Sequence, residues 1–422
     1  MSERPRIITT ENVLGVLSTP QGEGISAMIC TANWGPLDEV QIVSGLSDFR
    51  AKYGTHETGL TGYKGAEAFF SNGGYLKVIR VAHTGSAQSE KTFKDGSSVD
   101  AITLTAKYDG TYGDLINVTI VANGSNRDIY ISDGFTNEVY YNLSSNANIV
   151  SAINAGSNLV TAEVETGSPG LVAAITATYL ADGDNGTTSL DDDDYTTAFD
   201  TYLEDEEYRY LIIPGKTDNT FQITMNGKLE TRATNEEKYS RYLTGITASE
   251  SISTIQARTL AGRRSSLVAP SLVVDGTTYD GSYLACAVAG KLCSLGIGSA
   301  GTNKPLTASV DVKYSKPEQG ELLDDSVLVV AYINNELRIV KDMTRHADLT
   351  SPYKLGVICD EVDYARYKYE EYIRNQIGEP NTTLNRLDIS SGLNIVSSSL
   401  VDDSVIEEAL PATVVEGSSS DS

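Results

Sequence analysis

The first apolar stretches of this chain alternate between strand-like and helix-like spacing. The run Ile25–Ala32 predicts a buried strand, and Glu39–Val43 predicts a second one. Ser44 or Ser47 is then expected to cap a short helix that ends at Tyr53. A further helix and a further strand are predicted at Gly62–Phe70 and Tyr75–Val81. This strand–helix–strand rhythm predicts an α/β unit.

The spacing of apolar residues changes to a period of two between residues 96 and 188. Strands are predicted at Ala101–Ala106 and Ile116–Ile120, and Asp133-Gly134 predicts the turn of a hairpin that follows. The same alternation continues at Val160–Val164 and Ile175–Tyr179. We therefore expect a separate, mostly β domain that is inserted into the α/β domain.

Helical spacing returns after Ser189. Apolar residues at positions 195, 198, 199, 202 and 203 form one face, and the carboxylates of Asp191–Asp194 favour a helix N-terminus. The later strands and helices are predicted at residues 210–213, 251–260, 266–269, 283–295, 327–333, 337–341 and 360–377. The Ser-rich residues after them are expected to form a polar tail.

These patterns predict a multi-domain protein of the α+β or α/β class. It would have an α/β core, an inserted mostly-β domain, and a C-terminal α/β domain that carries extended terminal arms. The expected parts are an extended arm (1–24), the core (25–95 with 189–304), a peripheral β-rich domain (96–188), the C-terminal domain (305–402), and an arm and tail (403–422).

Composition and charge exclude several classes of partner. The 57 acidic residues against 32 Lys and Arg give a net charge of −25, which disfavours binding to nucleic acid. No run approaches the length of about 20 apolar residues that a membrane span needs. The first residues lack the apolar segment of a secretory signal, so cytosolic synthesis is expected. The four scattered cysteines are expected to be buried free thiols rather than disulfides or a zinc site.

No motif assigns catalytic residues, a cofactor or a metal. Val288–Leu292 is the segment most like a phosphate-binding loop, but it lacks the first glycine and the hydroxyl residue. The acidic segments Asp182–Gly186 and Asp191–Asp194 are the best metal candidate, although a turn and a helix N-terminus account for them without Ca²⁺. His56 and the other two histidines lie in no local catalytic pattern.

Six short motifs resemble those of contractile phage tail sheath proteins, a family that includes sheaths of tail-like bacteriocins and injection systems. Each motif alone has little specificity, but all six occur in the expected order. The resemblance covers about residues 5 to 390. The matching segments are Gly24–Gly54, Phe69–Gly74 with Lys77–Val81, Leu104–Gly110 with Gly113-Asp114, Leu180–Gly186, Leu211–Asp218 and Tyr372–Gly378.

The resemblance implies a structural subunit and no enzyme. Such subunits polymerise helically around a tail tube and contract together to drive the tube through a cell envelope. The implied partners are further copies of the chain, the tail tube protein, and baseplate and tail terminator proteins. The implied location is a virion tail assembled in the host cytoplasm. A tail-associated surface-binding module and a cell-wall polymer hydrolase remain as alternatives.

Contacts between subunits are expected at the two chain ends. The ends would supply strands to the sheet of a neighbouring subunit, where the pair 327–333 and 337–341 would offer two free edges if nothing else in the chain covers them. The alternative is that both ends are disordered tails. The expected arm residues are Ile7, Ile8, Thr9, Val405, Ile406, Val414 and Val415. The expected acceptor residues are Val327, Val329, Ala331, Leu337 and Ile339.

A tube contact is expected on the helix Asp360–Ile377, which belongs to the domain that would face the tube. Its apolar positions fall on one side, and its charges make up the remainder. The alternative is a solvated polar face over a core. The tube-facing candidates are Arg366, Lys368, Glu370 and Arg374.

Overall fold

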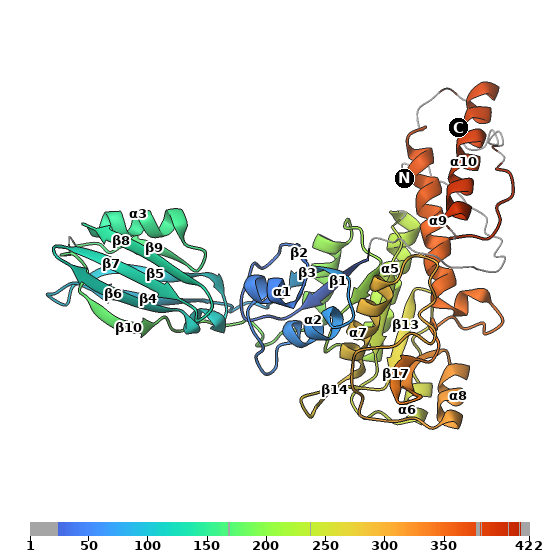
Figure 1. The fold of residues 1–422 in the computed structure, drawn as a ribbon, viewed down its shortest axis with the longest axis horizontal. Coiled ribbons are helices and arrows are strands. Elements are labelled where there is room, and N and C mark those ends of the chain that lie inside the picture. The colour runs from blue at the N-terminus through green and yellow to red at the C-terminus, as the bar shows by residue number, and fades with distance from the viewer. Residues whose placement is uncertain are drawn as a thin grey trace. The chain divides into compact units, whose positions relative to one another are not determined.

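The structure is a computed structural model, and it describes residues 24–167, 169–236, 238–376, 380, 382–403, 405–412 and 414 (Figure 1). The chain divides into two compact units. Unit 1 comprises residues 1–28, 65–77 and 203–422, and unit 2 comprises residues 29–64 and 78–202. Several sheets and helices alternate along the chain, so the fold is of the mixed α/β kind that the sequence predicts.

The largest sheet has eight strands in the order β17-β16-β13-β12-β11-β1-β3-β2. The pairs β1–β11, β11–β12, β12–β13 and β13–β16 are parallel, whereas β16 and β17 form an antiparallel hairpin. Every residue of β11, β12 and β13 is buried, as expected for parallel strands that are covered on both faces. The strands are β1 (Ile25–Cys30), β2 (Gln41–Val43), β3 (Tyr75–Arg80), β11 (Tyr210–Ile212), β12 (Arg241–Gly245), β13 (Ser265–Ala269), β16 (Val327–Ile333) and β17 (Glu336–Ile339).

Helices and one short hairpin complete the described part of unit 1. Almost the whole of α7 is buried, because its sequence of small residues lets it lie inside the protein. In Figure 1, α9 and α10 run side by side, and Tyr369 of α9 contacts Ser397 of α10 through their hydroxyl oxygens at 2.8 Å. The elements are α2 (Gly62–Phe70), α5 (Asn219–Asn235), α6 (Ile252–Gln256), β14 (Leu272–Val274), β15 (Thr277–Tyr279), α7 (Gly281–Ser294), α8 (Lys316–Asp324), α9 (Gly356–Arg374) and α10 (Thr383–Asp402).

Unit 2 contains two further antiparallel sheets. One has the order β4-β5-β9 and the other β10-β6-β7-β8, and α3 lies over the strands in Figure 1. Ile102, Ile129 and Ile153 are completely buried in their shared core. The elements are α1 (Leu46–Tyr53), β4 (Gln88–Lys94), β5 (Asp100–Asp109), β6 (Asn117–Asn123), β7 (Asn126–Ser132), β8 (Asn137–Leu143), α3 (Asn146–Gly156), β9 (Val160–Val164), β10 (Ile175–Tyr179) and α4 (Asp192–Ala198).

Two predictions about helix starts have opposite outcomes. The cap predicted for α1 is wrong, because the helix begins after Gly45 without a side-chain cap and Ser47 lies inside it, whereas the predicted end of the helix at Tyr53 is confirmed. Ser44 instead donates its backbone N–H to the carboxylate of Asp48. The helix N-terminus predicted at Asp191 is confirmed, since Asp191 and Asp194 form a reciprocal capping box.

The Ser-rich tail predicted after residue 377 is also wrong, because α10 occupies 20 residues of it. Thr382 caps α10 by accepting the N–H of Asn385. The helix has no continuous apolar stripe, and few of its side chains are buried against the rest of the described chain. Leu400 is buried against Ile297 and Val405, and Val396 packs on the same cluster.

The two free edges expected at the β16–β17 hairpin are absent from the described part of the chain. On one side β16 pairs with β13, with Leu267 opposite Val327. On the other side residues 303–306 cover β17, where Leu306 N–H donates to the Leu337 carbonyl at 2.9 Å. An arm strand from another subunit would have to displace residues 303–306 to pair with β17.

Candidate functional site

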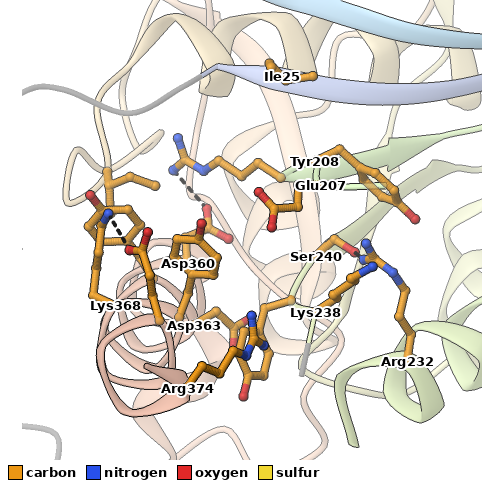
Figure 2. Close-up of a pocket in the computed structure, with 16 residues that line it drawn as sticks. Ile25, Glu207, Tyr208, Arg232, Lys238, Ser240, Asp360, Asp363, Lys368 and Arg374 are labelled. Carbon is orange, nitrogen blue, oxygen red and sulfur yellow. Dashed lines mark hydrogen bonds and ion pairs between the residues drawn. The ribbon is translucent and has the colours of Figure 1, made fainter. Parts of the chain in front are cut away.

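A hollow of unit 1 lies at the amino edge of the parallel strands. It has a volume of about 690 Å³ and is bounded by residues just before β11 and β12 and by one side of α9 (Figure 2). We call it the amino-edge groove, defined by Ile25, Tyr208, Tyr239, Tyr364 and Tyr367 together with the charged residues of its rim. Open α/β sheets of enzymes bind their ligands at the opposite, carboxyl ends of the strands.

The carboxyl edge of the same sheet is filled by the chain itself. A β-carbon on Gly245 would lie 1.8 Å from the carbonyl carbon of Gly281, so the end of β12 touches the start of α7 directly. Ser282 accepts the N–H of Gly215 at 2.7 Å, which ties the loop after β11 to the same helix end. Together these contacts close the carboxyl ends of β11 and β12.

A buried charge cluster fixes the first turns of α9 to the sheet. Asp360 of α9 accepts from Arg209 and Arg241, both at 3.1 Å, and from the Tyr210 hydroxyl at 2.6 Å. Arg241 also bonds Asp342 at 2.9 Å. We call these five residues the α9 clamp. Each of the four charged side chains of the clamp is less than 10% exposed, so the charges compensate one another inside the protein.

Burial and the neighbouring charges also shift the pKa values of two groups in the clamp, Arg241 and Tyr210. Burial disfavours a charged guanidinium, but Asp342 and Asp360 outweigh it and raise the pKa of Arg241 well above its usual range. Burial raises the pKa of the Tyr210 hydroxyl as well, so that group stays a neutral donor to Asp360. One turn further along α9, Asp363 forms a two-point ion pair with Arg264, at 2.7 and 3.1 Å.

Glu361 is an acidic group of α9 whose protonated form is favoured by burial. Its side chain is 3% exposed, and its Oε1 atom has no hydrogen-bond partner. Burial, with a smaller contribution from the Asp360 charge, raises the pKa of the Glu361 carboxyl to about 8. No sequence pattern distinguishes this glutamate from the exposed Glu371 on the same helix, so the sequence analysis missed it.

The four predicted tube-facing residues do not share one environment. Glu370 is buried and accepts a hydrogen bond from Tyr239, so it faces the interior of unit 1 and its assignment is not supported. Lys368 lines the amino-edge groove and pairs with Glu371 at 3.1 Å. Arg374 is exposed at the groove rim, and Arg366 is half-buried.

The predicted arm residues lie in three situations. Ile7, Ile8 and Thr9 lie outside the described residues, as does Val415. Val405 is buried next to Leu400, to whose carbonyl its N–H donates at 2.9 Å, and Ile406 packs on the same cluster. Val414 is half-buried. The described C-terminal residues thus follow α10 in this subunit and form no strand.

Three of the recognised sequence motifs meet in unit 2 through one polar junction. Glu57 accepts from Asn33 and from Asn185, both at 3.1 Å, and also from the Thr111 hydroxyl. Asn185 in turn accepts the N–H of Thr111 at 3.0 Å. The loops that contain Asn33, Thr111 and Asn185 are therefore tied together at the base of the β-rich part.

The Phe-Phe-Ser-Asn-Gly-Gly motif serves close packing in unit 1. A β-carbon on Gly290 of α7 would lie 2.2 Å from the Phe69 carbonyl oxygen, so the two backbones touch. Asn72 bonds Thr307 through both groups of its amide, at 3.1 and 2.8 Å. Gly290 and Lys291, which resemble part of a phosphate loop, thus lie inside a packed helix.

Other predicted chemistry has a structural explanation. Asp184 accepts the N–H of Gly186 at 2.7 Å, as in an ordinary turn, and Asp194 pairs with His83 at 3.0 Å. Within the residues that the structure describes, no three His, Cys, Asp or Glu side chains are placed to hold a metal ion. All four cysteines are free and buried, which confirms that prediction. In the same described residues, every helix is too short or too polar to cross a membrane.

Solved structures of similar fold cover nearly the whole chain. The sheath tail protein of Desulfitobacterium hafniense matches with a TM-score of 0.70 at 16% identity, over 93% of this chain and 89% of that one. The sheath tail protein of Listeria innocua matches with 0.71 at 15% identity, over 92% and 86%. The chain has the contractile sheath protein fold. This fold extends to the contracted helical sheath of the anti-feeding prophage, with a TM-score of 0.52 at 11% identity, over 95% and 84%.

The sheath protein fold is found here by structure and not by sequence. No protein-family model matches the chain, and a search of curated proteins finds no match. At such low identity, the shared feature is the order and packing of the elements. The motif residues named above have local packing roles in this chain.

Proposed function

We propose that this chain is the subunit of a contractile tail sheath, which polymerises helically around a tail tube and shortens to drive the tube through a cell envelope. The observation that carries the proposal is the fold match over 92–96% of the chain to proteins described as sheath tail proteins and as contracted sheaths.

The proposed partners are other copies of this chain, the tail tube protein, and baseplate and tail terminator proteins, within a virion tail assembled in the host cytoplasm. We propose that residues 305–402 face the tube, and that residues 96–188 form the peripheral domain. The terminal arms would add strands to the β17 edge of a neighbouring subunit in place of residues 303–306.

The decisive experiment is electron microscopy of the purified chain, alone and with its tube protein. Hollow striated tubes of constant diameter are expected. Removal of residues 1–20 should leave a folded subunit that no longer forms tubes, because the N-terminal arm would be missing. Monomers that bind glycan or cleave it, with no tubes under any condition, would contradict the proposal and favour a surface-binding module or a hydrolase.

The tube contact has its own test. Arg366→Glu with Arg374→Glu reverses two charges on α9 outside the clamp and is expected to weaken binding of the sheath to the tube. Glu321→Lys on α8 is the control, because it also reverses an exposed charge. Assembly of sheath on the tube is measured by sedimentation. Equal assembly by the two variants would contradict a contact between α9 and the tube.

A further inference from the structure

We infer that the amino-edge groove is the docking site of residues 1–23 of the same chain while the subunit is unpolymerised. The inference rests on the proposed function, because docking would delay polymerisation only if the arm otherwise joins a neighbouring subunit. The docking itself is a property of the single chain and is tested on it.

The first argument is connectivity. Ile25, the first residue of β1, lines the groove, and Gly24 precedes it, so the segment before Gly24 is tethered at the groove. A tethered segment acts at an effective concentration of about a millimolar, so even a contact of low intrinsic affinity is occupied in the single chain.

The second argument is the chemistry of the groove. Four tyrosines give it broad surfaces that are apolar with a polar edge, which suits an extended peptide with both kinds of side chain. The carboxylates of Glu207 and Glu371 are exposed at the rim, and Figure 2 shows Glu207 pointing from the strand side toward α9. The rim also carries Lys238 and Arg374, and Glu371 pairs with Lys368, so the rim has charges of both signs. The segment is mixed as well: Arg4 and Arg6 flank Pro5 and complement Glu207, and Glu3 lies next to them.

The third argument concerns the other chain end. The C-terminal residues up to Ala412 already have a place along α10, where the N–H of Ala412 donates to Asn394 at 2.7 Å. Val405 is buried on the same helix. The described C-terminal segment therefore follows α10, whereas the N-terminal segment begins at the groove.

A crosslinking experiment on the full chain tests the docking. Thr9→Cys is combined with Lys238→Cys at the groove rim, and a short bis-maleimide is added at low micromolar protein concentration. The four native cysteines are buried, so the introduced thiols react selectively. The matched control combines Thr9→Cys with Tyr75→Cys, because Tyr75 is exposed, does not line the groove, and lies next to the tether point, where its N–H donates to the Gly24 carbonyl at 2.8 Å. The groove pair is expected to crosslink within one chain about tenfold faster than the control pair, because docking raises the local concentration of the arm.

Charge reversal gives the second measurement. Glu207→Lys with Glu371→Lys, added to the groove pair, is expected to reduce its crosslinking rate about fivefold by removing the complementary charges. Rates that are equal for the groove and control pairs would overturn the inference, and so would crosslinked dimers in place of monomers. Selective crosslinking in a chain that never forms tubes would retain the docking and reject the sheath function. Tubes formed by a chain that shows no selective crosslinking would reject the docking and retain the sheath function.

Discussion

Replacing Glu361 by Gln tests whether this buried carboxyl is protonated in the folded subunit. Its pKa is about 8 in the fold and 4.5 ordinarily. Between these values the unfolded chain is ionised while the folded chain holds the proton, so stability falls as pH rises. The slope is about 1.4 kcal/mol per pH unit, which amounts to about 3 kcal/mol at pH 7. Gln has nearly the same volume and does not titrate, so this loss should vanish in the variant.

The assay is urea unfolding at pH 5, 7 and 9, followed by circular dichroism. The stability difference between Glu361→Gln and wild type should grow in favour of the variant by about 3 kcal/mol or more from pH 5 to pH 9. Fluorescence of Trp34, the single tryptophan, reports unit 2 and serves as an internal control. Glu371→Gln, on the exposed side of the same helix, should follow wild type. A stability difference between Glu361→Gln and wild type that stays constant across this pH range would refute the reasoning.

Three further variants test packing and charge. Asp360→Asn should lower the unfolding free energy by about 3–5 kcal/mol, because two buried arginines lose their shared charged partner. Asp205→Asn at the exposed surface should change it by less than about 0.5 kcal/mol in the same urea unfolding assay. Gly290→Ala should lower the free energy of unfolding by about 1–3 kcal/mol, because the new methyl group would meet the Phe69 carbonyl oxygen. Gly227→Ala has open space around it and should raise the free energy of unfolding by about 0.4–1 kcal/mol. Equal effects of the two substitutions would contradict the packing argument. Deletion of residues 96–188 with a short linker should leave tube formation intact, as judged by electron microscopy, if this domain is peripheral; complete loss of polymerisation would contradict that placement.

The sequence predicted elements well where one periodicity was strong. The alternation from Ala101 onward marks real strands, and the hairpin turn at Asp133-Gly134 lies between β7 and β8. It failed for α5 and α10, whose Thr, Ser and Asn residues favour turns when read locally, and which are helical because their caps and tertiary contacts override that preference.

The candidate site was less accessible to sequence reasoning than the fold. Nothing in the spacing relates Arg209, Arg241 and Asp360, because they come from three elements that meet only in the folded chain. The same holds for Glu370, whose charge suggests an exposed position and whose burial depends on Tyr239. Periodicity reports which side of an element is buried, and it does not report which distant charges will neutralise one another.

The α9 clamp has a consequence for how ionic strength should act on this protein. Salt screens charges that water reaches, and it affects buried pairs much less. Contacts between rim residues such as Arg374 and another molecule would weaken in concentrated salt, while the bond from Arg241 to Asp342 would persist. Concentrated salt should therefore dissociate an assembly of these chains into folded subunits. In these subunits α9 would still be bound to the sheet, so they could reassemble when the salt is removed.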